Sequence, residues 1–234
     1  QWGLHGRRRA LLIHGLSASA AGWWRIADAL AGSGYHVIAP DLRGHGRAPR
    51  TASYRLEGYA ADLWEFGDGW DLVVGHSLGG ALAALISGRE GFTRRLVLLD
   101  PVLMIPEDQF DAVLADQLSE LDDSGDPAAV HARNPSWHPE DAAIKAVALQ
   151  QTSRFVVERT FLENRPWWYL DLLGDVPAPT TIVGADPAAG ALFDRAVGEE
   201  MARRNPRLKV MTIAGAGHNL HREAAERVLE ILLS

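Results

Sequence analysis

Short, continuous apolar runs alternate with amphipathic stretches along most of the chain. Each run is short enough for a strand, and glycine, proline or aspartate residues bound it. Strands without an alternating polar face are typical of a parallel sheet that helices cover on both sides. The predicted strands are residues 10–13, 35–39, 71–74, 96–99, 180–183 and 208–213, and the predicted helices between them are 23–31, 56–66, 190–205 and 223–233. The pattern therefore predicts an α/β fold with a mostly parallel sheet.

The middle of the chain departs from this alternation. Residues 104–175 contain no convincing strand, and four helical stretches fill them, at 107–121, 126–133, 139–150 and 154–164. We therefore expect a core of residues 1–103 and 176–234, interrupted by a helical insertion. The insertion is rich in aromatic residues, most of which are expected to bury its own inner face. A lid over a binding site would need some of them to face the ligand.

A serine stands at the apex of a predicted strand–turn–helix. Gly75-His76-Ser77-Leu78-Gly79 follows the strand 71–74 and opens an apolar helical stretch. A side chain two residues before or after the serine would crowd the point where strand and helix nearly touch. Chance alone supplies such a pattern in roughly one chain of this composition in ten. Its flanks and its downstream partners make Ser77 the predicted nucleophile.

A serine hydroxyl needs a base, and the base needs an acid to orient it. His218 lies in a glycine-rich loop after the last predicted strand, and Asp186 ends the preceding strand just before Pro187. We predict that His218 is the base and Asp186 the acid. The alternatives are His221, near the start of a helix, and Asp100, which also ends a strand.

Five segments together resemble the α/β-hydrolase superfamily over nearly the whole chain. They are His14-Gly15-Leu16-Ser17, residues 41–46 (DLRGHG), residues 75–80 (GHSLGG), residues 184–187 (GADP) and residues 215–219 (GAGHN). The resemblance implies the triad Ser77, Asp186 and His218, and it identifies the insertion with the helical cap of that family. It also implies that the backbone N–H groups of Leu16 and Leu78 form the oxyanion hole.

The resemblance is specific for the fold and poorly specific for the substrate. We expect Val102, Trp137 and Trp167 to line the substrate pocket. Family members usually carry a strand hairpin ahead of the first histidine-glycine loop, whereas only 13 residues precede His14 here. The sheet is therefore expected to lack one or two edge strands.

Composition excludes several other classes of protein. The net charge of −7 argues against nucleic-acid binding, and the absence of cysteine excludes disulfides and thiolate chemistry. No apolar stretch reaches the ~18 residues of a membrane span, and the first ten residues lack a signal-peptide core. His218 and His221 have metal-ligand spacing but no evident third ligand. We expect a cytoplasmic monomer or homodimer that needs no metal and no cofactor.

The residues thus predict a serine hydrolase that cleaves a carboxylic ester or lactone through an acyl-enzyme. The aromatic insertion favours a hydrophobic small molecule as the substrate. Thioester hydrolysis, acyl transfer and carbon–carbon cleavage remain open, because the same three side chains can perform them. A small-molecule receptor with little turnover also remains open.

Overall fold

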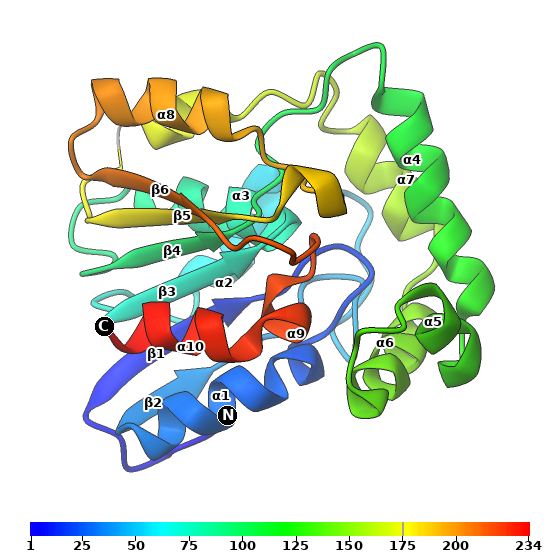
Figure 1. Cartoon of the computed structure of the whole chain (residues 1–234), viewed down its shortest axis with the longest axis horizontal. Coiled ribbons are helices and arrows are strands. Elements are labelled where there is room, and N and C mark those ends of the chain that lie inside the picture. Colours follow the sequence, from blue (N-terminus) through cyan, green and yellow to red (C-terminus); the bar gives the residue numbers. More distant parts are fainter. Residues whose placement is uncertain (175) are drawn as a thin grey trace.

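All six predicted strands form one parallel sheet in the computed structural model, which describes residues 1–174 and 176–234 (Figure 1). The strands are β1 (Arg8–Ile13), β2 (Tyr35–Ile38), β3 (Leu72–His76), β4 (Leu96–Leu99), β5 (Thr180–Gly184) and β6 (Leu208–Thr212), in the order β2-β1-β3-β4-β5-β6. Every pair of neighbours is parallel. An antiparallel bridge joins Trp2 to Val37 beside the edge strand β2. The predicted fold class is confirmed.

Helices cover both faces of the sheet, as continuous apolar strands require. Alternate residues of β1 enter two separate cores: Leu11 and Ile13 on one face, and Ala10 and Leu12 on the other. The first face packs against α2 (Leu56–Trp64), α3 (Leu78–Ser87) and α8 (Arg195–Arg204), and the second against α1 (Trp24–Gly32) and α10 (Ala225–Leu233).

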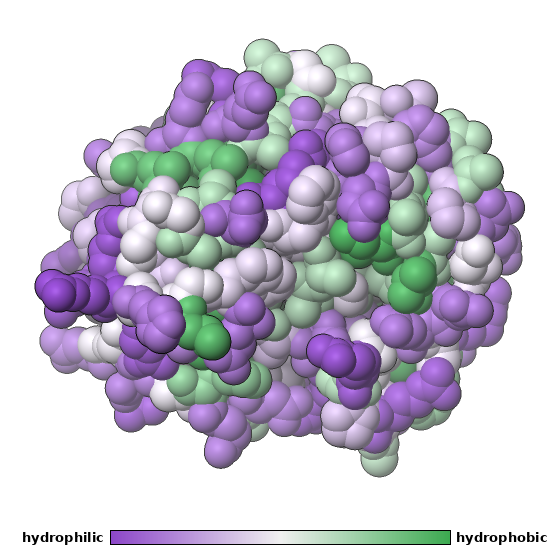
Figure 2. All heavy atoms as spheres, turned by 90° about the horizontal axis from the view of Figure 1, so that it is seen from below, coloured by the Kyte–Doolittle hydropathy of each residue, from purple (hydrophilic) through white to green (hydrophobic). Residues whose placement is uncertain are grey.

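The face of the molecule drawn in Figure 2 is mostly polar. The face in Figure 2 shows apolar residues scattered in small patches among hydrophilic ones. Among the described helices, none is long and apolar enough to cross a bilayer. The cytoplasmic location and the monomeric or dimeric state stay predictions.

Between β4 and β5 the described chain forms helices and no named strand. These are α4 (Phe110–Ser119), η2 (Glu120–Asp123), α5 (Pro127–Arg133), α6 (Pro139–Gln151), α7 (Arg154–Leu162) and η3 (Leu170–Leu173). We call residues 104–174 the inserted segment. Its helices α4 to α7 lie together beyond one end of the sheet (Figure 1). The predicted boundary at Asp175 lies outside the described residues.

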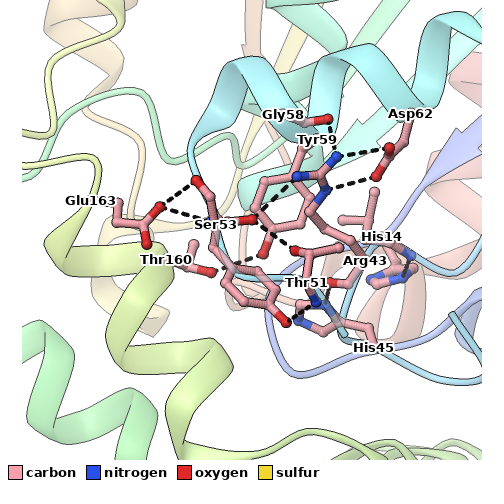
Figure 3. Close-up of polar contacts among 12 residues, drawn as sticks. His14, Arg43, His45, Thr51, Ser53, Gly58, Tyr59, Asp62, Thr160 and Glu163 are labelled. Carbon is pink, nitrogen blue, oxygen red and sulfur yellow. Dashed lines mark hydrogen bonds and ion pairs between the residues drawn. The ribbon is translucent and has the colours of Figure 1, made fainter. Parts of the chain in front are cut away.

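The loop after β2 forms hydrogen bonds both with the core and with the inserted segment (Figure 3). The Arg43 guanidinium donates to both carboxylate oxygens of Asp62 on α2, at 2.7 and 2.8 Å. Glu163, at the end of α7, accepts hydrogen bonds from the Ser53 hydroxyl (2.7 Å) and the Tyr54 N–H (2.8 Å). The two hydrogen bonds to Glu163 position the end of α7 against this loop, and the Arg43–Asp62 contacts fix the loop on the core.

The strand order places a crevice at the carboxyl ends of β1 and β3. After β1 the chain passes to β2 on one side, and then returns to β3 on the other side of β1. Loops that leave two adjacent parallel strands in opposite directions open a crevice between them, where ligands of α/β proteins bind. The loop after β1 begins at His14, and the residue after β3 is Ser77.

Candidate functional site

Ser77 occupies a strained turn between β3 and α3. Its backbone has φ 56° and ψ −121°, which is rare for a residue with a side chain. A Cβ atom on Gly75 would lie 2.1 Å from the carbonyl oxygen of Gly79, and one on Gly79 would lie 2.2 Å from that of Ile13. The steric requirement for both glycines is therefore confirmed. Ser77 lies beside a cavity at the carboxyl end of the sheet.

His218 contacts Asp100, the residue that ends β4. The Nδ1 atom of the imidazole lies 2.6 Å from Oδ2 of Asp100. Asp100 is completely buried, and its carboxylate also accepts hydrogen bonds from the backbone N–H groups of Ala185 (3.0 Å), Leu192 (2.9 Å) and Phe193 (3.3 Å). Such donors stabilise the charged form of a buried carboxylate. Asp100 therefore holds the proton on Nδ1 and leaves Nε2 free to accept one.

The structure places Asp100, and not the expected Asp186, against His218. The Asp186 carboxylate instead accepts hydrogen bonds from the N–H groups of Gly215 (2.7 Å) and Ala188 (2.9 Å). These backbone donors lower the pKa of Asp186, which lies at the surface. Asp186 thus stabilises the turn that leads to His218 and does not contact the imidazole. The difference arises because the carboxylate caps its own short helix, η4 (Pro187–Ala189).

Two further residues hold the loop of His218, and the sequence analysis missed both. Glu223 accepts hydrogen bonds from the N–H groups of Gly217 (2.7 Å) and Asn219 (3.2 Å), on either side of the histidine. His76 Nε2 lies 2.9 Å from the backbone carbonyl oxygen of His218. The glutamate five residues after the histidine was the available sequence signal, since its short spacing allows it to reach back to the loop.

The proposed oxyanion donors, Leu16 and Leu78, lie beside Ser77. Within the described chain, neither backbone N–H donates a hydrogen bond to another protein group. The N–H of Leu78 opens α3, where the helix dipole favours negative charge. The loop that contains Leu16 is fixed by His14, whose Nδ1 donates to Gly15 O (2.7 Å) and whose Nε2 accepts from Leu42 N (3.0 Å).

Two cavities meet at Ser77. The smaller one, the apolar cavity, is lined mainly by aliphatic and aromatic side chains: Leu16, Leu78, Val102, Ile105, Val113, Phe161, Trp167 and Leu192. Two of the predicted pocket residues, Val102 and Trp167, lie here, and the indole N–H of Trp167 donates to Val102 O (2.9 Å). Trp168 is 56% exposed and lies outside this lining.

The second, the polar cavity, contains the third predicted pocket residue, Trp137. It also contains Ser77, His218, Gln117, Glu120, Lys145, His221 and Arg222. Its volume is about 70 Å³, whereas one water needs roughly 10–15 Å³ on this measure. The cavity therefore accommodates a group of a few heavy atoms. Its walls are far more polar than the aromatic composition of the insertion predicts.

His221, the alternative base, lies in the wall of this site and contacts no carboxylate among the described residues. Its ring packs at tilted angles against Trp23 and His76, with centroids 4.7 and 4.6 Å away. Burial lowers the pKa values of His221 and His76 well below the usual histidine range. Both rings are therefore neutral packing groups at neutral pH. The described residues contain no group of three or more potential metal ligands.

The family model described as "Alpha/beta hydrolase family" matches residues 10–231 of this sequence. The chain belongs to the alpha/beta hydrolase family. The matched residues include all of the sheet except the first two residues of β1, together with the inserted segment, Ser77, Asp100 and His218. Membership agrees with the sheet order, the serine turn and the position of the histidine after the last strand.

Two of the relatives are named as lipases. The chain is 34% identical over 158 residues to lipase LipV of Mycobacterium tuberculosis. These residues cover 64% of this chain and 59% of LipV. It is 40% identical over 86 residues to lipase 3 of a Moraxella strain, covering 34% of this chain and 27% of that lipase. The matched region thus spans less than two thirds of the length of these relatives.

Among solved structures, a thioesterase domain from the curacin biosynthetic pathway has a TM-score of 0.78 and 25% identity. The match covers 99% of this chain and 93% of that domain. The insertion and the core therefore both have counterparts in a known hydrolase structure.

Proposed function

We propose that the protein hydrolyses a carboxylic ester through an acyl-enzyme on Ser77. The observation that carries this proposal is the 2.6 Å contact between His218 and the buried Asp100, made by a histidine that shares a cavity with the strained serine. An imidazole held in this tautomer can take the proton of a serine hydroxyl. The lipases among the relatives support an ester as the bond that is cleaved.

The proposed reaction has two halves. Ser77 Oγ attacks the ester carbonyl carbon while its proton passes to His218 Nε2, and the carbonyl oxygen becomes an oxyanion. The N–H groups of Leu16 and Leu78 stabilise that charge, each such donor contributing about 3 kcal/mol in well-studied hydrolases. The leaving alcohol takes the proton from His218. Water then attacks the acyl-enzyme with the same base, which releases the acid and restores Ser77.

The apolar cavity favours a hydrophobic group on one side of the ester bond. It is narrow and lined by Val102, Phe161 and Trp167, among others. An open-chain ester and a lactone both present the same carbonyl to Ser77. In a lactone the leaving alcohol stays attached to the acyl group and is retained after the first step.

A thioester is the second candidate substrate, because the curacin thioesterase domain matches nearly the whole chain. The same three side chains cleave esters and thioesters, and only the leaving group differs. A panel of 4-nitrophenyl esters, lactones and acyl thioesters with matched acyl chains distinguishes these possibilities by their kcat/KM values.

The test of the proposed mechanism is Ser77→Ala. We expect kcat/KM for 4-nitrophenyl acetate to fall at least about 10³-fold, and labelling by a fluorophosphonate to disappear. Ser87→Ala is the matched control, because Ser87 ends the helix that Ser77 precedes, is buried, and has a hydroxyl without a hydrogen-bond partner. Retained turnover in Ser77→Ala would disprove the assignment. Labelling without turnover across the whole panel would instead identify a receptor.

A further inference from the structure

Arg222 is a buried arginine that faces the polar cavity. It lies on the short helix α9 (Leu220–Glu223), four residues after His218, and only 4% of it is exposed. Its side chain lines the same cavity as Ser77 and His218. The guanidinium carbon lies 4.4 Å from the centre of the Trp137 ring, which holds the side chain in place by a cation–π contact.

No carboxylate in the described chain forms an ion pair with Arg222. Its Nε atom is buried and has no hydrogen-bond partner. Burial lowers the pKa of Arg222 to about 10, so the group remains charged at neutral pH. A buried charge without a partner costs considerable free energy. The site therefore contains a cation whose partner must come from elsewhere.

Nearby acids do not fill this role, because each binds another group. Asp141 pairs with Arg25 (2.5 Å) and accepts a hydrogen bond from the Trp24 indole (3.0 Å). Glu223 is the nearest acid in sequence, and its two oxygens accept the N–H groups of the His218 loop.

The other charges along the polar cavity cancel in pairs. Lys145 Nζ lies 2.6 Å from Glu120, and Arg133 lies 2.7 Å from Asp123. Once these pairs are set aside, Arg222 is the charge that remains in this part of the described lining. This lining therefore carries one cation without an ion-pair partner, and the carboxylates of Asp141, Glu120 and Glu223 act on it only from beyond ion-pair distance.

We infer that Arg222 binds a carboxylate of the substrate, so that the preferred ester is a monoanion with its carboxylate in the polar cavity. This inference rests on the proposed function. A guanidinium binds a planar carboxylate through two parallel hydrogen bonds. The 70 Å³ cavity suits a short chain between carboxylate and ester. The hydrophobic part of the substrate then lies in the apolar cavity, on the other side of Ser77.

The experiment compares two pairs of esters that differ only in charge. Mono-4-nitrophenyl succinate and 4-nitrophenyl butyrate place the carboxylate on the acyl side. 4-Acetoxybenzoate and its methyl ester place it on the alcohol side. We expect wild-type kcat/KM to favour the anion in one pair by about 10- to 100-fold, the usual effect of a hydrogen bond to a charged group.

Arg222→Gln is expected to abolish that preference by raising KM for the anion, so that the loss of kcat/KM is at least about tenfold larger for the anion than for the neutral ester. Arg222→Lys keeps the charge without the two-pronged geometry and should retain part of the preference. Arg154→Gln is the control: its side chain is exposed and lies outside both cavities, so removing its charge should change the preference little.

Three results would overturn the inference. One is an active wild-type enzyme without preference in either pair. Another is a folded Arg222→Gln variant that loses both esters equally, since this would assign the arginine to packing against Trp137. If no ester is cleaved at all, the proposed function fails, and the carboxylate site is then tested by ligand binding alone. Succinate, but not succinamide, should then raise the Tm of the wild type and leave that of Arg222→Gln unchanged; equal shifts would exclude a carboxylate site.

Discussion

The ends of β4 and β5 look alike in sequence and differ completely in environment. Each strand ends in a short apolar run, and each is followed by an aspartate and a proline: Asp100-Pro101 and Asp186-Pro187. Asp100 is fully buried and contacts His218, whereas Asp186 lies at the surface and caps a turn. A strand end therefore supplies the position for an acid, and the neighbouring strands decide what that acid contacts. β4 lies directly beside β3, which ends at Ser77.

The sharpest test of this contrast is Asp100→Asn. The substitution removes the charge that stabilises the imidazolium and favours the wrong tautomer of His218. We expect kcat/KM to fall about 10³- to 10⁴-fold, as for the equivalent change in serine proteases. Steady-state kinetics with 4-nitrophenyl acetate measures it, and thermal melting checks the fold. A nearly active Asp100→Asn beside an inactive Asp186→Asn would restore the assignment made from sequence.

Two other histidines, His14 and His45, are buried, and they predict how the stability of the protein depends on pH. Burial lowers the pKa of His14 to about 4 and that of His45 to about 3, below the value near 6.5 in an unfolded chain. The unfolded chain therefore binds these protons at a higher pH than the folded one. The neutral rings contribute their full share to the free energy of unfolding above about pH 6.5, and this contribution decreases as the pH falls toward 4. For His14 alone the loss is about 3 kcal/mol.

Urea unfolding at several pH values between 7 and 4 measures that loss. His45→Asn keeps a donor for the carbonyl oxygen of Arg43, which lies 3.0 Å from His45 Nδ1, but cannot titrate. We expect its unfolding free energy to depend less steeply on pH than that of the wild type. The same slope in both proteins would show that these rings are not the groups responsible.

The smallest effect is expected for Asp186→Ala. The variant loses the hydrogen bonds to Gly215 and Ala188, but its side chain is outside both cavities. Activity should fall by less than about tenfold, because the loop of His218 keeps its contacts with Glu223 and His76. Measuring kcat/KM beside Asp100→Asn, under the same conditions, tests the contrast directly. A loss as large as that of Asp100→Asn would show that the outer turn sets the histidine position.

Local rules of the chain were enough to predict much of the fold. The apolar runs 10–13 and 96–99 fall within the observed strands, because a strand buried on both faces needs little more than a continuous apolar run. The turn at Ser77 was also readable, since the clash that excludes side chains at Gly75 and Gly79 involves atoms close in sequence or in adjacent strands.

Pairings between distant loops were decided only by the tertiary structure. Asp100 reaches His218 across 118 positions of sequence, and its other partners come from two further segments. Arg222 gains its significance from the absence of a partner within the described site, which no local pattern reveals. The sequence by itself determined the strands, the helices and the strained serine, because these depend on neighbouring residues. The packing of separate loops determined which acid meets the histidine and which charge is left for a ligand.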